Sequence, residues 1–380
     1  MNKYINITLY LFVVFFSLSG IAQTANTGAA IDTFATYSIS AYTDVYYAGY
    51  TDNTPHGSFV KFPTVSPRNN SVGLNDLQVS FRYDGEKIRG VATLQYGDIA
   101  QSSWSKTYNN IQEAHAGVRL SKTLWLDGGF FKSHFGTENL LPVDNIASAL
   151  ATPTYYECYY EAGLRLNYDP TTQLEINLFL LNGYNMFEDN NNRKSFGMGI
   201  TYSINDHAGV GYTNYIGNDA PDSVTLSHRR VAQNVFFNYH KGKICVQAGG
   251  DLYIQQHAGV TDSNKTAIAF AGLLTIAYKL PHQMQVYARG EVFNDADAFL
   301  STAITDTKQQ LTGYKLYGVT AGIAYKPVPN AYVRLEGRRL QMAQNQDIFE
   351  YNGQYRDYRY EVMVTAGISF SLLKGVETRY

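Results

Sequence analysis

The sequence is poor in cysteine and in charge. Two cysteines in 380 residues exclude a disulfide framework and a zinc site built from four thiolates. Only 16% of the residues are Asp, Glu, Lys or Arg, against about 25% in a typical soluble domain. Thirty Lys and Arg against 32 Asp and Glu leave a formal net charge of -2, so the chain lacks the basic excess of a sequence-independent nucleic-acid binder. Tyrosine, in contrast, is as frequent as glycine, with 32 copies of each.

The chain also lacks a long apolar run of the kind that forms a membrane-spanning helix. Its N-terminus has Lys3, an apolar stretch at 9–18, and the small residues Gly20 and Ala22, which together predict a signal peptide over residues 1–22. The apolar stretch is shorter than the roughly 20 residues that a membrane-spanning helix needs. We therefore expect an exported protein that is not a helical membrane protein.

Apolar and polar residues alternate repeatedly after residue 35, which is the period-2 pattern of strands with two different faces. Sixteen segments show this pattern: 36–47, 74–83, 87–97, 111–120, 123–131, 157–168, 173–183, 195–204, 207–216, 230–239, 243–254, 267–279, 283–293, 314–325, 331–340 and 359–371. Most have 10 to 12 residues, the length that a tilted strand needs to cross the hydrocarbon layer. All ten prolines fall between these segments, as expected where every strand is paired on both sides.

The connections between the segments alternate in length. Every second connection has two to five residues, and the others have 11 to 26 residues rich in Asn, Asp, Ser, Thr and Gly. A transmembrane barrel has this asymmetry because its periplasmic turns are short and its extracellular loops are long. The sequence therefore predicts an all-β fold, a transmembrane antiparallel β-barrel of about 16 strands over residues 36–371. Residues 23–35 are expected to form a short periplasmic segment, and residues 372–380 either a C-terminal tail or the end of the last strand.

The two faces of each predicted strand differ in polarity. In segment 74–83, Leu77 and Val79 alternate with Gln78 and Arg82. Sixteen strands enclose a lumen too wide for side chains to fill, so we expect the polar face to line a wet interior and the apolar face to contact lipid. Aromatic residues on the apolar face are expected to form two interfacial girdles. The turn-side girdle comprises Tyr37, Tyr83, Tyr168, Tyr202, Tyr239, Tyr278, Tyr325 and Phe370, and the loop-side girdle comprises Tyr47, Tyr96, Phe130, Phe196 and Tyr360.

The two cysteines are predicted to lie on opposite faces of the barrel. Cys158 has the lipid-facing parity of segment 157–168, and Cys245 has the lumen-facing parity of segment 243–254. These segments are far apart around the wall, so we expect two free thiols even in an oxidising compartment.

Several stretches are distinctive beyond their alternation: ISAYTDVYYAGY at 39–50, VGLNDLQVSFRYD with the VATLQYGD that follows, GGFFKSHFGTENLLPVDN at 128–145, and LFLLNGYNMFEDNNNRKSFGMGITY at 178–202. They resemble the OmpL-like outer-membrane β-barrel porins. The resemblance is clearest over residues 35–215. It implies a pore for small hydrophilic solutes in the outer membrane of a Gram-negative bacterium, without catalytic residues. The C-terminus departs from such barrels, which tend to end on an aromatic strand residue, because Phe370 is followed by SLLKGVETRY.

The predicted third external loop, over residues 132–156, is long enough to fold into the lumen and narrow it. Its acidic residues are Glu138 and Asp144. We assign lumen-facing cations, as candidate residues of the constriction, to Arg82, Arg89, Arg289, Lys315, Arg334 and Arg338. Opposed charges across a constriction would create a transverse field that orients dipolar solutes and penalises apolar ones. The alternative is that these are ordinary lumen charges paired locally, for instance Arg334 and Arg338 with Glu336 between them.

The function predicted from these features is passive diffusion of small hydrophilic solutes through a water-filled channel. A structural or adhesive barrel, or one that carries apolar solutes, is the alternative, and an outer-membrane enzyme is a further one. Ser133 and His134 lie near Asp127 in the sequence, but this spacing does not make a catalytic triad. No cofactor or metal is expected, because the eight histidines show no metal-ligand spacing. The expected partners are outer-membrane lipid and solutes, with homo-oligomerisation left open and no nucleic acid.

Overall fold

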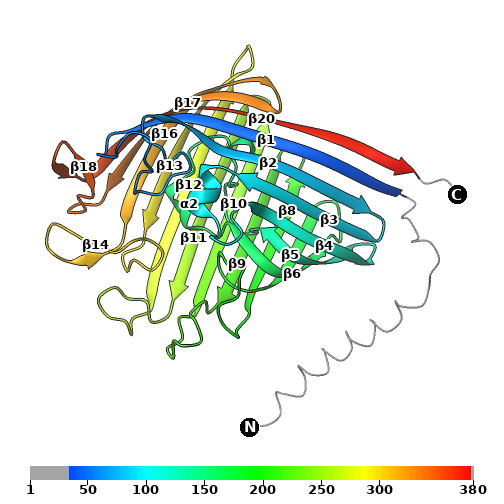
Figure 1. Ribbon diagram of the computed structural model, residues 1–380, viewed down its shortest axis with the longest axis horizontal. Helices are drawn as coiled ribbons and strands as arrows, with labels where there is room; N and C mark the ends of the chain where they lie inside the picture. Colours follow the sequence, from blue (N-terminus) through cyan, green and yellow to red (C-terminus); the bar gives the residue numbers. More distant parts are fainter. Residues whose placement is uncertain (1–33, 378–380) are drawn as a thin grey trace, which may run out of the picture.

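The computed structural model describes residues 34–377, and sixteen of its strands close into one barrel (Figure 1). The barrel strands are β1 (Phe34–Tyr50), β2 (Ser71–Gly85), β3 (Ile88–Tyr96), β4 (Ile111–Ser121), β5 (Leu124–Lys132), β6 (Tyr160–Tyr168), β7 (Leu174–Leu181), β8 (Ser195–Asn205), β9 (Ala208–Gly217), β10 (Arg230–Lys241), β11 (Ile244–Gln255), β12 (Ala267–Lys279), β13 (Met284–Asn294), β16 (Lys315–Val328), β17 (Ala331–Met342) and β20 (Tyr358–Glu377). Each of the sixteen predicted segments is one of these strands, so the predicted fold class is confirmed.

Every barrel strand is antiparallel to its neighbours in the chain, and β1 closes the barrel by pairing with β20. The long connections gather at one end, opposite the start of β1 and the end of β20 (Figure 1). This arrangement follows from the alternation of short and long connections in the sequence. The predicted signal peptide and most of the segment 23–35 lie outside the described residues.

The long connections contain the remaining elements. They are the helices α2 (Asp98–Ser103) and α3 (Thr152–Tyr156), the 3-10 turn η1 (Pro142–Asp144), and two small hairpins, β14 (Ile304–Thr305) with β15 (Leu311–Thr312) and β18 (Phe349–Tyr351) with β19 (Gln354–Arg356). None of the helices in the described part of the chain is long and apolar enough to cross a membrane. At the C-terminus, β20 extends to Glu377, and its residues from Glu361 to Glu377 pair with the whole of β1.

The alternation of burial along the strands separates a polar interior from an apolar exterior. On β17, Arg334 and Glu336 are buried, whereas Val333 and Leu335, which alternate with them, are exposed. The outward residues form an apolar band, and most aromatic residues of the two predicted girdles are exposed on it. Phe130 differs, because its ring stacks on Phe187 with the ring centroids 4.2 Å apart. A long loop therefore covers this member of the girdle.

The connection between β5 and β6, residues 133–159, folds into the barrel and is called the lumen loop below. Its Thr137 Oγ1 accepts a hydrogen bond from Asn234 Nδ2 of β10 at 3.0 Å. The hydroxyl oxygen of Ser148, in the same loop, lies 2.6 Å from Thr365 Oγ1 of β20. Since β10 and β20 are separated by five strands of the closed barrel, the loop crosses the lumen.

The position predicted for Cys158 is wrong. Helix α3 precedes it and β6 begins only at Tyr160, so Cys158 belongs to the lumen loop and not to a strand with a lipid-facing side. It packs inside the barrel with Phe135, Tyr184 and Tyr215. Both cysteines are free thiols, with Cys158 buried and Cys245 half-buried.

Candidate functional site

The lumen loop is fastened to one side of the barrel by a buried ion pair. Glu138 Oε1 accepts a hydrogen bond from Arg289 Nη1 of β13 at 2.9 Å. The other oxygen of Glu138 accepts from the backbone N–H of Ala151 at 2.8 Å and from Thr154 Oγ1 at 3.1 Å. Arg289 is 1% exposed and also donates to the Ala149 carbonyl at 2.5 Å. One carboxylate and one guanidinium thus satisfy several polar groups of the loop at once.

Two neighbouring positions on β17 bind the loop backbone with opposite charges. Arg334 donates from Nη1 to the Pro142 carbonyl at 2.7 Å and from Nη2 to the Asn145 carbonyl at 2.8 Å. Glu336 accepts from the backbone N–H groups of Ser148 and Ala149, the second at 2.9 Å. The loop therefore presents carbonyls to the cation and N–H groups to the anion. This pairing fixes the position of the segment around η1.

A chain of ion pairs continues from β13 to β20. Arg338 Nη2 lies 2.5 Å from Glu291 Oε1, and its Nη1 lies 3.5 Å from Glu361 Oε2. Arg359 donates to Glu361 with its Nη2 2.5 Å from Oε1. Arg338 also donates to Thr152 Oγ1 of the lumen loop at 3.0 Å. Sequence reasoning missed Arg359 and Glu361, although both have the lumen-facing parity of the predicted strand 359–371.

We call Arg289, Arg334, Arg338 and Arg359 the arginine wall. All four are at most 4% exposed, and all point at loop backbone or carboxylates and not at open space. The local-pairing interpretation therefore matches their contacts, although Arg334 and Arg338 bind the loop and Glu291, not Glu336 between them.

The remaining predicted cations lie elsewhere. Arg82 is exposed, and with Arg89 it lines a small cavity of about 140 Å³. Arg89 binds Asp127, with Nε and Oδ1 2.7 Å apart, and Arg165 Nε lies 3.2 Å from the other oxygen of that carboxylate. The hydrogen-bond and ion-pair partners of Arg89 and Arg165 within residues 34–377 are Asp127 and Asn167, which lie on β5 and β6 and not in the lumen loop.

Lys315 was assigned to the lumen, and the structure corrects this. It shares the parity of Tyr317 and Val319, which are exposed, whereas Leu316 is buried. Lys315 is the first residue of β16, at the loop end, where the lipid-facing side of a strand meets water and tolerates a charge.

Asp144 ends η1 of the lumen loop, in the segment that Arg334 binds through the Pro142 and Asn145 carbonyls, and its own side chain is exposed. This segment lines a cavity of about 620 Å³ together with the turn residues Leu280 and Pro327, so the loop reaches the periplasmic end of the barrel. Desolvation raises the pKa of the Asp144 carboxyl, and Lys132 only partly opposes this shift.

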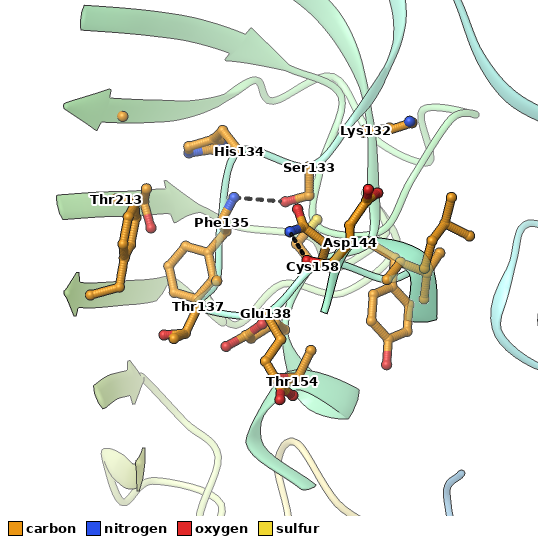
Figure 2. Close-up of a pocket in the computed structure, with 18 of the residues that line it drawn as sticks. Lys132, Ser133, His134, Phe135, Thr137, Glu138, Asp144, Thr154, Cys158 and Thr213 are labelled. Carbon is orange, nitrogen blue, oxygen red and sulfur yellow. Dashed lines mark hydrogen bonds between the residues drawn. The ribbon is translucent and has the colours of Figure 1, made fainter. Parts of the chain in front are cut away.

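On the other side of the loop lies a cavity of about 380 Å³ (Figure 2). His134, Glu138 and Asp144 of the lumen loop border it, as does Lys132 at the end of β5, and Thr213 of β9 faces it from the barrel. The lining residues that β7 to β11 contribute are uncharged, and we call them the cavity wall: Asn177, Gly199, Thr201, Thr213, Phe236, Asn238 and Gln247. Of these, Thr201 and Asn238 are exposed.

His134 holds the start of the loop against β8 and β9. Its Nδ1 lies 2.9 Å from Glu161 Oε2, and its Nε2 lies 2.8 Å from the Asn214 carbonyl. Burial alone would lower the pKa of His134, but the Glu161 carboxylate outweighs it and the net shift is upward. Gly197 permits this approach, because a Cβ there would lie 2.6 Å from the imidazole.

Glu157 is the buried carboxylate of the cavity. It is 2% exposed, and its Oε1 has no hydrogen-bond partner among the described residues. Burial raises the pKa of Glu157 well above the ordinary range, and the carboxylates of Asp251 and Glu138 add to this shift. In residues 34–377 no group of three or more His, Cys, Asp and Glu side chains is arranged to hold a metal ion.

The profile of the family described as "Putative beta-barrel porin-2, OmpL-like" matches residues 36–371 of the chain. The chain belongs to this porin family. The membership agrees with the resemblance seen in the sequence, and it places the porin in the outer membrane of a Gram-negative bacterium. A search of curated protein sequences found no match.

Solved outer-membrane channels share the fold of this porin at low sequence identity. The channel DcaP of Acinetobacter baumannii is 12% identical with a TM-score of 0.57, and the match covers 90% of this chain and 100% of that one. OmpF of Salmonella typhi, solved with daunomycin, is 12% identical with a TM-score of 0.56, covering 87% and 97%. A trimer form of OmpT from Vibrio cholerae is 10% identical with a TM-score of 0.54, covering 88% and 99%. At these identities the matches show the barrel fold alone.

Proposed function

We propose that this porin forms a water-filled channel for the passive diffusion of small hydrophilic solutes, and that the path runs between the lumen loop and the cavity wall. The observation that carries the proposal is the cavity of about 380 Å³ bounded by uncharged polar side chains of the barrel. The side chains of Asn177, Thr201 and Asn238 can form hydrogen bonds either with water or with a solute. Because these side chains are uncharged, the exchange of water for a solute does not require the desolvation of an ion.

The exposure of the lumen supports this path. Thr201 and Asn238 of the cavity wall are exposed, as is Ser203 further along β8 towards the turn. The arginine wall, in contrast, is covered by the lumen loop. The open part of the lumen is therefore the part lined by β7 to β11.

Single-channel conductance in planar bilayers and solute uptake by liposomes test the proposal. Asn238→Trp places an indole in the path and is expected to lower both. Phe237→Trp is the matched control, because Phe237 precedes it on β10 but is exposed on the lipid side. A wild-type protein that conducts no ions, or an equal effect of the two variants, would overturn the proposed path.

We also propose that the signal peptide of residues 1–22 is removed on export and that the mature porin assembles as a homo-oligomer. The N-terminal sequence pattern supports the first statement, and the trimer form of the Vibrio OmpT supports the second. N-terminal sequencing of the exported protein should begin at Gln23, and the mass of the detergent-extracted protein should be a multiple of the mature chain.

A further inference from the structure

Three basic residues lie near one another on the outer face of the barrel, at its loop end. Lys315 is the first residue of β16, Arg339 lies near the loop end of β17, and Arg356 ends β19 just before β20. The Ala343 N–H donates to the Lys315 carbonyl at 2.7 Å, and Arg339 pairs with Tyr360 of β20. Since β16, β17 and β20 are neighbours and adjacent strands are about 4.8 Å apart, these strands occupy roughly 10 Å around the barrel. Arg339 and Arg356 both lie against the Tyr358 ring. Lys315 lies four residues beyond Val319, the register partner of Arg339, which is roughly 13 Å further towards the loops. We call them the outer basic patch.

The patch points away from the lumen. Arg339 is exposed, whereas its chain neighbours Arg338 and Leu340 are buried. Lys315 has the outward parity of β16, as described above. The Arg356 guanidinium donates from Nη1 to the Tyr358 hydroxyl at 3.2 Å. These positions belong to the level of the loop-side girdle, since Arg339 and Tyr360 are register partners.

The described part of the chain provides no anion for the patch. Within residues 34–377, neither Lys315 nor Arg339 nor Arg356 has a carboxylate within 4.0 Å. The contacts that the arginine side chains do make are neutral. Arg339 donates to Gln341 Oε1 at 2.7 Å and lies 5.5 Å and 5.7 Å from the ring centroids of Tyr358 and Tyr360. The residues of the arginine wall differ, because each of the four has a carboxylate or loop carbonyls as partners.

Unpaired guanidinium groups on the outer face of a barrel need an explanation from physical chemistry. A charge on the lipid side is unfavourable near the bilayer centre and tolerated only at the interface. At the interface, the anions available to it are the phosphates of lipid headgroups. The planar guanidinium binds phosphate oxygens in a bidentate manner. Tyrosine rings favour the membrane interface, where they pack against the region between the sugar and the acyl chains of a lipid.

We propose that the outer basic patch is a binding site for the phosphorylated headgroup of the glycolipid that forms the outer leaflet of the outer membrane. Arg339 and Arg356 bind the phosphate, and Lys315 adds charge from the neighbouring strand. Tyr317 and Tyr360, both exposed, flank the site from β16 and β20. The site lies outside the lumen, so it does not depend on the proposed diffusion path.

Binding to lipid A with and without its phosphates tests the proposal. The full-length porin, stripped of lipid in detergent, is added to phosphatidylcholine vesicles that contain either phosphorylated or dephosphorylated lipid A. We expect tighter association and a higher unfolding temperature with phosphorylated lipid A only. Each of Lys315→Gln, Arg339→Gln and Arg356→Gln should weaken binding roughly fivefold, because one cation near an anionic headgroup contributes about 1 kcal/mol.

The controls separate this site from other sources of binding. Lys243→Gln removes an exposed cation at the turn end and should leave the affinity unchanged. Arg339→Lys keeps the charge and should recover part of the binding, which guards against a folding defect in the Gln variants. The proposal would be overturned if the porin bound dephosphorylated lipid A or an anionic phospholipid as tightly as phosphorylated lipid A. It would also be overturned if inorganic phosphate alone raised the unfolding temperature, or if the Gln variants lost their oligomers but kept their bound lipid.

Discussion

The two sides of the lumen use polar residues in different ways. On β13, β17 and β20, the arginine wall and its glutamates are buried and hold the lumen loop by ion pairs and backbone hydrogen bonds. On β7 to β11, the cavity wall is uncharged and faces open space. The comparison teaches that the buried charges of the lumen hold the lumen loop in place, whereas neutral amides and hydroxyls line the cavity beside it, where we propose that the solute path runs.

The difference has a physical reason. A charge buried without a partner is very unfavourable, so arginines in the lumen need either water or carboxylates and carbonyls around them. The lumen loop supplies the carbonyls of Pro142, Asn145 and Ala149 for this purpose. Neutral side chains such as Thr201 and Asn238 are exposed and can bond to water, and they therefore need no partner from the loop.

The largest expected effect comes from breaking the arginine wall. Arg338→Met leaves Glu291 without its ion-pair partner and removes a donor to Thr152 of the lumen loop. Loss of one partner of a buried pair costs about 3–5 kcal/mol, so the urea midpoint in detergent should fall strongly. The fluorescence of the two tryptophans reports the unfolding. A double variant that also has Glu291→Leu should recover much of the loss, and a failure to do so would contradict the pairing.

A smaller effect is expected from the anion that holds the loop backbone. Glu336→Gln keeps the shape of the side chain but weakens the hydrogen bonds from Ser148, Ala149 and the Tyr287 hydroxyl, the last at 2.5 Å. Hydrogen bonds to a charged group contribute about 2 kcal/mol. The loop should then move more freely, which single-channel recordings would show as a larger and noisier conductance. A conductance trace identical to that of the wild type would remove Glu336 from the loop anchor.

The acidic residues of the lumen loop that line the cavity should make the ion selectivity of the channel depend on pH. Burial raises the pKa of Glu157 and of Asp144, so both become neutral at a pH where ordinary carboxyls, with pKa values of about 4, are still charged. The cation-over-anion permeability ratio should therefore fall as the pH is lowered, and the fall should begin above the pH range in which ordinary carboxyls titrate. Glu157→Gln should flatten this profile, and an unchanged profile in that variant would exclude Glu157 as its source.

The smallest effect is expected on the cavity wall. Thr213→Val removes a hydroxyl that has no partner among the described residues and should change the free energy of unfolding by about 0.5 kcal/mol or less. Thr320→Val is the matched variant on the other side, because the Thr320 hydroxyl accepts from Arg289 Nη2 at 3.2 Å. It should lose about 1 kcal/mol or more. Equal losses in the two variants would remove the distinction between the two sides.

Most of the fold was predictable from the sequence, because a transmembrane strand must alternate in polarity over its full length. The sixteen segments, their antiparallel order and the two faces follow from that rule and from the alternating connections. The boundaries of β6 and β20 were less predictable. Residues 152–156 form α3 within the lumen loop, where contacts with the barrel, such as that between Thr152 and Arg338, hold them. The alternation of polarity in the sequence does not indicate such a contact.

The candidate site was predictable in its residues but not in its pairings. Glu138, Arg289, Arg334 and Arg338 have the expected types and parity, and the structure brings them together around the loop. Which cation binds which anion depends on where the loop crosses the lumen, and this depends on contacts between residues far apart in the sequence, such as Ser148 and Thr365. Lys315 shows the opposite case, since its own parity in the segment 314–325 was sufficient to place it outside the lumen.

Substituted-cysteine block of the conductance tests the central comparison most directly. In a background without Cys158 and Cys245, one variant carries Asn238→Cys in the cavity wall and another carries Thr320→Cys behind the lumen loop, where the native side chain is 0% exposed. A charged hydrophilic thiol reagent should reduce the current through the Asn238→Cys channel and leave the Thr320→Cys channel unchanged. Block of the second channel without block of the first would contradict the account.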